Sequence, residues 1–312
     1  RNNFMKKLYF ALLLIVSMFL AACSLDSPGS EKSDSEKGST GSEGDYKIGL
    51  SVSTLNNPFF VTLSDGAEAK AKELGAAVTV VDAQDNASKQ ASDVEDLIQQ
   101  GVDLIIINPV DSQAVVSSVE SANAANIPVV TVDRSSEGGE IVAHIASDNV
   151  AGGELAGEYL LELVGEGSAV VELEGVAGSS AARDRGEGFN NVADGKLDVV
   201  AKQTANFNRA EGLTVMENIL QANPDIKGVF AHNDEMALGA LEAIESAGKD
   251  IIVIGFDATD DAVKSVENGK LAGTIAQKPE QIGEKAMEAA IKALKGEEVE
   301  ASIPVDLELI KK

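Results

Sequence analysis

Tryptophan is absent from this sequence, and all aromatic residues together make up only 4% of it. Apolar residues still account for 44% of the 312 residues, so a core must be built mainly from valine, isoleucine, leucine and alanine. These side chains are typical of buried parallel strands that are covered by helices. The composition therefore favours an α/β fold, and the residues after position 45, about 270 in number, are enough for two ordinary domains.

Positive charge is also scarce in the chain. Lysine and arginine number 25 against 51 aspartate and glutamate residues, which gives a formal net charge of −26. Nucleic acids and anionic membrane surfaces would both repel a chain of this charge. The sequence therefore argues against a nucleic-acid partner.

The chain has one cysteine, Cys23, so an internal disulfide bond is excluded. This cysteine follows two lysines and an apolar run over residues 8–22. About fifteen apolar residues are too few for a hydrocarbon core that needs roughly twenty, so residues 1–22 are predicted to be a signal peptide. Residues 20–23 (LAAC) resemble the bacterial lipobox, which implies that Cys23 becomes a lipidated N-terminus. The alternative interpretation is a buried or incidental cysteine.

Residues 23–45 are rich in serine, glycine, glutamate, lysine and aspartate. A segment this polar cannot bury enough apolar surface to fold. It is predicted to be a flexible acidic tether, with a root-mean-square reach of about 25 Å for some twenty residues. Such a tether would hold the folded part near a membrane without fixing its orientation.

Beyond Tyr46, short apolar runs alternate with amphipathic stretches. The first series predicts strands at 47–52, 77–81, 103–107, 128–132 and 141–145, and helices at 58–74, 88–100 and 112–125. Repeated units of this kind imply a mostly parallel sheet with helices on both faces, because right-handed crossovers place them there.

A second series follows without a linker rich in proline or glycine. It predicts helices at 150–164, 181–192, 209–221, 235–246 and 260–267, and strands at 169–173, 197–204, 228–231, 251–255 and 271–276. A final helix at 279–294 and a strand at 303–309 complete the chain. The fold class is therefore predicted as α/β, with two doubly wound parallel-sheet domains.

Polar and aromatic residues follow the predicted strands at their carboxyl ends, where ligands bind in sheets of this kind. They are Ser53 to Phe60, Asn108, Asp133, Arg134, Ser147, Phe207, Asn233, Asp234, Phe256, Asp257 and Gln277. Planar polar groups and flat aromatic faces suit a sugar, because its hydroxyls both donate and accept while its C–H faces are weakly apolar. The pattern offers no metal-ligand spacing and no phosphate-binding loop.

Several segments together resemble the ribose-binding proteins of bacterial ABC importers, which belong to the type I periplasmic binding proteins. The segments are 53–60 (STLNNPFF), 131–134 (TVDR), 144–149 (HIASDN), 182–189 (ARDRGEGF), 233–239 (NDEMALG), 255–257 (GFD) and 274–277 (TIAQ). The resemblance covers essentially all of residues 46–312.

This resemblance implies two lobes joined by three crossing segments, near residues 147–148, 277 and 305–306. One lobe would comprise 46–147 with 278–305, and the other 148–277 with 306–312. It also implies sugar-binding positions. Those expected to hydrogen-bond the sugar are Asn57, Asp133, Arg134, Arg185, Asn233, Asp257 and Gln277, and those expected to close on its faces are Phe59, Phe60 and Phe207.

Several of these residues also have a structural interpretation. Asn57 and Asn233 precede predicted helices and suit the N-cap position. Asp133 and Arg134 could form a solvated ion pair, which would contribute little to the stability of the fold. One of the adjacent Phe59 and Phe60 could belong to the core.

Arg183 and Arg185 are two positions apart at a helix start and cannot share one face. Arg185 is assigned to the ligand and Arg183 to solvent or structure. His144 and His232 are expected to be structural.

The predicted function is that of an extracytoplasmic, lipid-anchored monomer that captures D-ribose and delivers it to an ABC permease, without a cofactor, metal or catalytic residue. A cell without an outer membrane would need such an anchor. Another monosaccharide or a furanose-like signal, such as allose, xylose or autoinducer-2, is the alternative ligand.

Two other classes of protein fit the sequence less well. A glycosidase could use Asp133 and Asp257 as its carboxylate pair, but the sequence has no nucleophile elbow or triad pattern. The effector half of a sugar-responsive repressor would follow a DNA-binding headpiece, whereas here a signal peptide and an acidic tether precede Tyr46.

Overall fold

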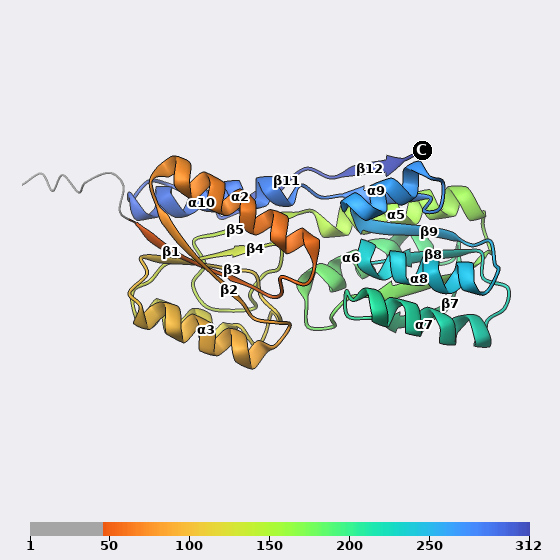
Figure 1. Ribbon diagram of the computed structural model, residues 1–312, viewed down its shortest axis with the longest axis horizontal. Helices are drawn as coiled ribbons and strands as arrows, with labels where there is room; N and C mark the ends of the chain where they lie inside the picture. The colour runs from red at the N-terminus through yellow and green to blue at the C-terminus, as the bar shows by residue number, and fades with distance from the viewer. Residues whose placement is uncertain (1–45) are drawn as a thin grey trace, which may run out of the picture. The chain divides into compact units, whose positions relative to one another are not determined.

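The computed structural model describes residues 46–312, and the predicted signal peptide, Cys23 and tether lie outside these residues. Within them, two six-stranded sheets are each accompanied by helices (Figure 1). The chain builds most of the first sheet before it starts the second. It then returns to the first sheet and ends in the second.

The first sheet has the strand order β11-β5-β4-β3-β1-β2, and all of its pairs are parallel. Its strands are β1 (Lys47–Val52), β2 (Ala77–Asp82), β3 (Leu104–Ile107), β4 (Val129–Val132), β5 (Ala143–Ser147) and β11 (Ser302–Val305). Its helices are α2 (Pro58–Leu74), α3 (Ala87–Gln99), α4 (Val116–Ala124) and α10 (Pro279–Leu294). We call this sheet with these helices the N-lobe.

The second sheet has the order β12-β10-β9-β8-β6-β7, and only its β10–β12 pair is antiparallel. Its strands are β6 (Ala169–Glu174), β7 (Asp198–Thr204), β8 (Gly228–Ala231), β9 (Ile252–Asp257), β10 (Gly273–Ala276) and β12 (Glu308–Lys311). Its helices are α5 (Asn149–Val164), α6 (Ser180–Ala193), α7 (Arg209–Ala222), α8 (Asp234–Ser246) and α9 (Asp260–Glu267). We call this sheet with its helices the C-lobe.

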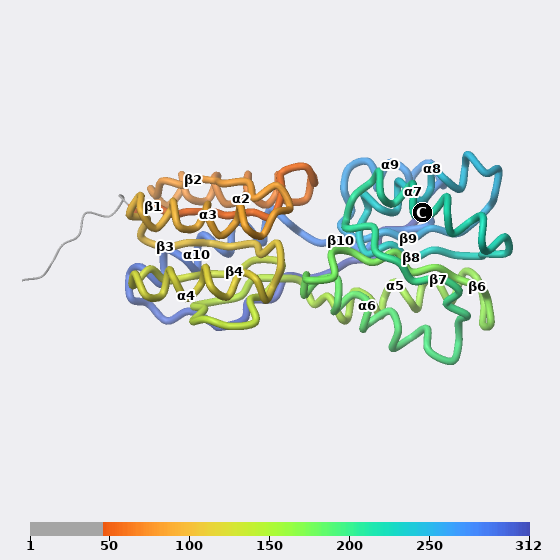
Figure 2. Tube along the Cα trace, turned by 90° about the horizontal axis from the view of Figure 1, so that it is seen from below, coloured from red at the N-terminus to blue at the C-terminus, as the bar shows by residue number. Residues whose placement is uncertain are grey.

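Three segments cross between the lobes, after β5, after β10 and between β11 and β12 (Figure 2). The predicted fold class, two doubly wound parallel-sheet domains joined by a three-strand hinge, is confirmed. The prediction of one strand at 303–309 is wrong. Here β11 pairs with β5 in the N-lobe and β12 pairs with β10 in the C-lobe, so residues 306–307 pass from one sheet to the other.

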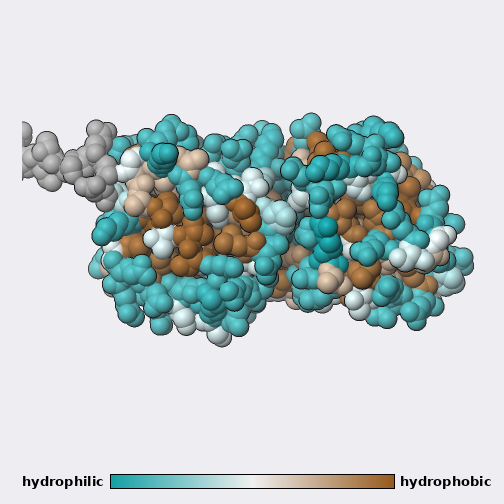
Figure 3. All heavy atoms as spheres, in the orientation of Figure 1, coloured by the Kyte–Doolittle hydropathy of each residue, from teal (hydrophilic) through white to brown (hydrophobic). Residues whose placement is uncertain are grey.

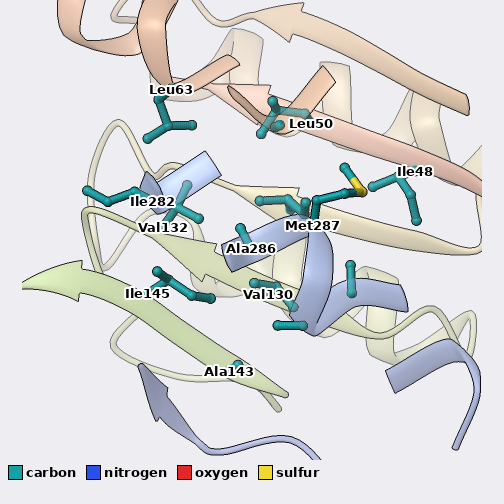
Figure 4. Close-up of a cluster of buried hydrophobic side chains, with 14 of the residues drawn as sticks. Ile48, Leu50, Leu63, Val130, Val132, Ala143, Ile145, Ile282, Ala286 and Met287 are labelled. Carbon is teal, nitrogen blue, oxygen red and sulfur yellow. The ribbon is translucent and has the colours of Figure 1, made fainter. Parts of the chain in front are cut away.

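Buried apolar side chains hold the helices on both faces of each sheet. On one face of the N-lobe sheet, Ile48 and Leu50 on β1 lie near Ala286 and Met287 on α10 (Figure 4). Ile48 and Leu50 share a face because side chains alternate along a strand. Both are 0% exposed, and burying each contributes about 1.5–3 kcal/mol.

Helices α2 and α10 approach each other closely through glycine. A Cβ on Gly66 of α2 would collide with the backbone of Glu280, and one on Gly283 of α10 would collide with the backbone of Leu63. Larger side chains at these positions would push the helices apart. This contact fixes the segment that follows β10 against the N-lobe.

Hydrophilic residues dominate the outer rim of the face shown in Figure 3, while apolar residues show in the middle of each lobe. Between residues 46 and 312, none of the helices combines the length and the apolar character that a membrane span requires.

Candidate binding site

A small pocket lies between the lobes, at the carboxyl ends of the strands. Its lining residues are Asn57, Phe59, Phe60, Asp133, Arg134, Ala181, Arg185, Phe207, Asn233, Asp257 and Gln277. The structure thus brings together all ten residues that the family resemblance assigned to the sugar. Ala181 is the lining residue that the sequence did not predict, since its small apolar side chain carries no chemical signal.

Two asparagines reach the pocket from helix N-termini. The Oδ1 atom of Asn57 accepts a hydrogen bond of 3.0 Å from the backbone N–H of Phe59, and Oδ1 of Asn233 accepts one of 3.0 Å from Met236. Both residues are therefore N-caps. Both residues also line the pocket, so the structural and the pocket-lining interpretations hold together.

Aromatic side chains from both lobes line the pocket. Phe59 and Phe60 meet edge to face, with ring centroids 5.1 Å apart, and both also belong to the N-lobe core. Phe207 comes from the C-lobe and has a left-handed backbone with φ of 58°. A Cβ on Gly175 would overlap the Phe207 ring, so this glycine leaves room for it.

Asp133 and Arg134 follow β4 and are almost completely buried, at 4% and 3% exposure. They are therefore not the solvated surface pair of the alternative interpretation. Asp133 adopts φ of 61°, which turns the chain directly after the strand. Its Oδ2 accepts a hydrogen bond of 3.3 Å from Asn108 and lies 3.6 Å from Nε of Arg134.

The Arg134 guanidinium is held by backbone and aromatic groups. Its Nη1 donates to the carbonyl of Pro109 at 3.1 Å, and its central carbon lies 5.2 Å from the ring centroids of both Phe60 and Phe207. Burial lowers the pKa of Arg134, and the Asp133 carboxylate opposes that shift. A charged group buried at this cost needs strong hydrogen-bond partners.

Arg185 lies at the centre of the charged groups. Its Nε donates to Oδ1 of Asn149 at 2.8 Å and its Nη1 donates to the carbonyl of His232 at 2.7 Å. Asp133 in the N-lobe lies 4.0 Å away and Asp257 in the C-lobe lies 3.9 Å away. Arg185 therefore faces carboxylates of both lobes.

Neighbouring Arg183 points elsewhere. It donates to Glu137 at 2.8 Å, and its side chain is 45% exposed. The side chains of Arg183 and Arg185 thus point in different directions, as the helical spacing predicted.

Asp257 and Gln277 lie where β9 and β10 end. Nε2 of Gln277 donates to Oδ1 of Asp257 at 2.8 Å. Burial raises the pKa of Asp257 well above its ordinary value of 3.8, and the Arg185 guanidinium opposes that shift. Gln277 belongs to the second segment that crosses between the lobes, so one side of the pocket is part of the hinge.

Three buried polar atoms at this pocket have no hydrogen-bond partner among residues 46–312. They are Oδ1 of Asp133, Nε of Arg134 and Oε1 of Gln277. Buried polar atoms without partners are rare in native proteins and call for an explanation. Two acceptors and one donor that line one small pocket suit a ligand with several hydroxyl groups.

Supporting residues behind the pocket were not assigned to the site from the sequence. Asn108, at the end of β3, was noted among the strand-end residues, and it contacts Asp133. Asn149 and His232 hold Arg185, and Nε2 of His232 lies 2.9 Å from the buried Glu172. His144 bonds Thr131 at 2.9 Å. Both histidines bond neighbouring buried side chains or backbone, as expected of structural residues.

Two wider clefts adjoin the pocket, of about 480 Å³ on the side of Asp257 and Gln277 and about 270 Å³ on the side of Asn57 and Arg134. No group of three or more histidine, cysteine, aspartate or glutamate side chains within the described part of the chain is placed to hold a metal ion.

Comparison with known proteins identifies the family of this chain. The profile of the periplasmic binding protein domain matches residues 48–298. The ribose import binding protein RbsB of Bacillus subtilis (strain 168) is 56% identical over 305 residues, which cover 98% of this chain and 99% of that protein. The RbsB protein of Escherichia coli (strain K12) is 56% identical over 267 residues, with 85% and 90% covered.

A solved structure shares the same fold. The periplasmic solute binding protein of an ABC transporter from Actinobacillus succinogenes 130z, with bound D-allose, has a TM-score of 0.79 and 32% identity. The match covers 85% of this chain and 97% of that one. The chain therefore belongs to the periplasmic binding protein family, in the branch that contains the ribose import binding proteins.

Proposed function

We propose that this protein captures D-ribose between its two lobes and delivers it to the permease of an ABC importer. Relatives named as ribose import binding proteins are 56% identical over 98% and 85% of the chain, which supports this ligand. As a solute-binding protein of this kind, it holds its ligand and releases it chemically unchanged.

The observation that carries the proposal is the pocket with three unpartnered buried atoms, of Asp133, Arg134 and Gln277. A pentose offers hydroxyls that donate to the two oxygens and accept from the guanidinium. Hydrogen bonds to charged groups contribute about 1.5–3 kcal/mol each. Aromatic rings from both lobes would cover the faces of the sugar, where its C–H groups lie.

Release and capture require the lobes to separate, and we assign 46–147 with 278–305 to one moving unit and 148–277 with 306–312 to the other.

The lobes touch directly beside the pocket. The backbone N–H of Ser135 donates to Oγ of Ser180 at 2.9 Å, and that of Ser112 donates to the carbonyl of Gly178 at 2.9 Å. A sugar that contacts both lobes stabilises this arrangement, and the permease recognises the closed form.

Lipid on Cys23 would anchor the protein at the outer face of the cell membrane, with residues 23–45 as the tether. The support is the pattern of two lysines, an apolar run and LAAC in the sequence. The alignment with the Bacillus relative spans 305 residues, so it includes most of residues 1–45. Replacing Cys23 by alanine should release the protein into the medium of a cell without an outer membrane. Retention of Cys23→Ala at the membrane would contradict the anchor.

The ligand is tested by calorimetry of residues 46–312 with D-ribose, D-allose, D-xylose and autoinducer-2. D-allose is included because the related Actinobacillus protein binds it. We expect the tightest binding for D-ribose, and recovered ribose should be unaltered. Ligand at a hundred times its Kd should also stabilise the fold by about 2.7 kcal/mol. Absence of heat with D-ribose and clear binding of another solute would overturn the proposal.

A further inference from the structure

The turn that carries Asp257 has an unusual backbone. Asp257 and Ala258 follow each other at the end of β9 with φ of 118° and 57°. Residues other than glycine rarely adopt positive φ, and such conformations persist only where the surroundings hold them in place. The surroundings of this turn therefore bear on where the Asp257 carboxylate lies.

Two buried side chains hold the turn from behind. Oδ2 of Asp234 accepts hydrogen bonds from the backbone N–H of Thr259 at 2.7 Å and from its hydroxyl at 3.2 Å. The hydroxyl of Thr274 accepts from the backbone N–H of Ala258 at 3.2 Å and donates to Oδ1 of Asp234 at 2.7 Å. The four bonds form one connected network.

This network lies behind the pocket, since neither Asp234 nor Thr274 lines it. Both side chains are 0% exposed. Asp234 occupies the first turn of α8 and Thr274 lies within β10, so the network ties the 257–259 turn to two rigid elements. Thr259 precedes α9 but its side chain does not cap that helix. Its hydroxyl bonds Asp234 instead.

We propose that Asp234 and Thr274 are positioning residues that hold the 257–259 turn and so direct the Asp257 carboxylate at the sugar. This inference rests on the proposed function for the part that Asp257 plays in ribose binding. Thr274 also pairs with Gly255 in the register that sets Ala276 beside Asp257. Gln277, which bonds Asp257, follows directly, so the same strand fixes both polar groups on this side of the pocket.

The test replaces Thr274 by valine, which keeps the shape of the side chain and removes its hydroxyl. We expect Thr274→Val to weaken ribose binding about tenfold, which corresponds to about 1.4 kcal/mol. Thr274→Ser should restore affinity because it returns the hydroxyl. Tyr159→Phe is the matched control: it removes a hydroxyl that bonds the carbonyl of Ala272 in the same lobe, without contact to the turn. It should leave affinity within about twofold.

A double-mutant cycle separates positioning from general destabilisation. If Thr274 acts through Asp257, then Thr274→Val should cost little affinity in a chain that already carries Asp257→Asn. An equal loss in both backgrounds would overturn the inference.

A readout without ribose completes the test. Hydrogen exchange of the backbone amides of Ala258 and Thr259 in the ligand-free chain should become faster in Thr274→Val, because their acceptors are removed or displaced. Unchanged exchange at both amides would overturn the inference even if ribose binding fell. Absence of ribose binding by the unmodified chain would instead refute the proposed function, and the exchange measurement would still decide the role of the network.

Discussion

Replacing Arg134 by lysine keeps a positive charge in the pocket but removes the planar fork of the guanidinium. In the native chain Nη1 is occupied by the carbonyls of Pro109 and Val110, at 3.1 and 3.5 Å. Nε lies 3.6 Å from Oδ2 of Asp133 but makes no hydrogen bond within residues 46–312, so its N–H remains for the sugar. A lysine ammonium is a single point charge and cannot satisfy the carbonyls and the sugar in the same way.

The size of the effect follows from the bonds that are lost. At least one hydrogen bond from a charged donor to the sugar disappears in Arg134→Lys, which is worth about 1.5–3 kcal/mol. Ribose affinity should therefore fall by about 10- to 150-fold. The stability of the ligand-free fold should change much less, because lysine still neutralises Asp133, which lies 3.6 Å from the guanidinium.

The assay pairs calorimetry with D-ribose and urea unfolding without it. Arg183→Lys is the matched control, because Arg183 lies on the same helix as Arg185, which lines the pocket, but is 45% exposed and contacts Glu137. It should change affinity by less than about twofold. Arg134→Lys with native affinity would refute the assigned role. A loss of stability as large as the loss of binding energy would show that Arg134 acts mainly in the fold.

Three further predictions concern other parts of the site. Gly175→Ala should displace the Phe207 ring, since a Cβ there would overlap it, and weaken ribose binding about tenfold or more by calorimetry; native affinity would contradict this. Glu137→Gln removes one charge of the ion pair with Arg183 that joins the lobes at 2.8 Å. Exposed ion pairs contribute about 0.2–1 kcal/mol, so ribose affinity should fall by no more than about fivefold at low salt. At about 1 M salt it should not fall, because the pair is screened. A loss of ribose affinity that persists at high salt would exclude a simple ion pair. Burial raises the pKa of Asp234 from 3.8 to about 7, so the folded chain binds a proton at Asp234 more tightly than the unfolded chain does. The stability that this protonation contributes therefore falls as the pH rises from about 4 to about 7. Asp234→Asn should reduce that fall in urea unfolding from about pH 4 to about pH 8, and an unchanged slope would refute it.

Much of the architecture was predictable because local patterns decide it. Strand β1, helix α2 and helix α10 were predicted with the bounds that the structure has. Each has a clear local signal, such as proline at the first turn of α2 and α10. The last strand was not predictable in this way. Its alternation of apolar residues continues through residues 306–307, so the local pattern shows no break there. The crossing near residues 305–306 was expected only from the family resemblance, and the structure divides the segment between two sheets.

The residues of the candidate site also differ in whether local patterns could predict them. Position at a strand end identified Asp133, Arg134 and Asp257, because parallel strands direct their carboxyl ends to one edge. Helical spacing separated Arg185 from Arg183. The partners that orient these side chains were not predictable, since His232, Asn149 and Asp234 reach them from segments far away in the sequence.

The sequence by itself thus predicted the two α/β lobes from its periodicity, and its family motifs predicted the three crossings and ten of the eleven residues that line the pocket, because periodicity and motifs are local features. Only the tertiary structure decided how those residues are held. The positive φ of Asp257 and the network behind it depend on packing between β9, β10 and α8. Such packing brings together atoms that no local pattern relates to one another.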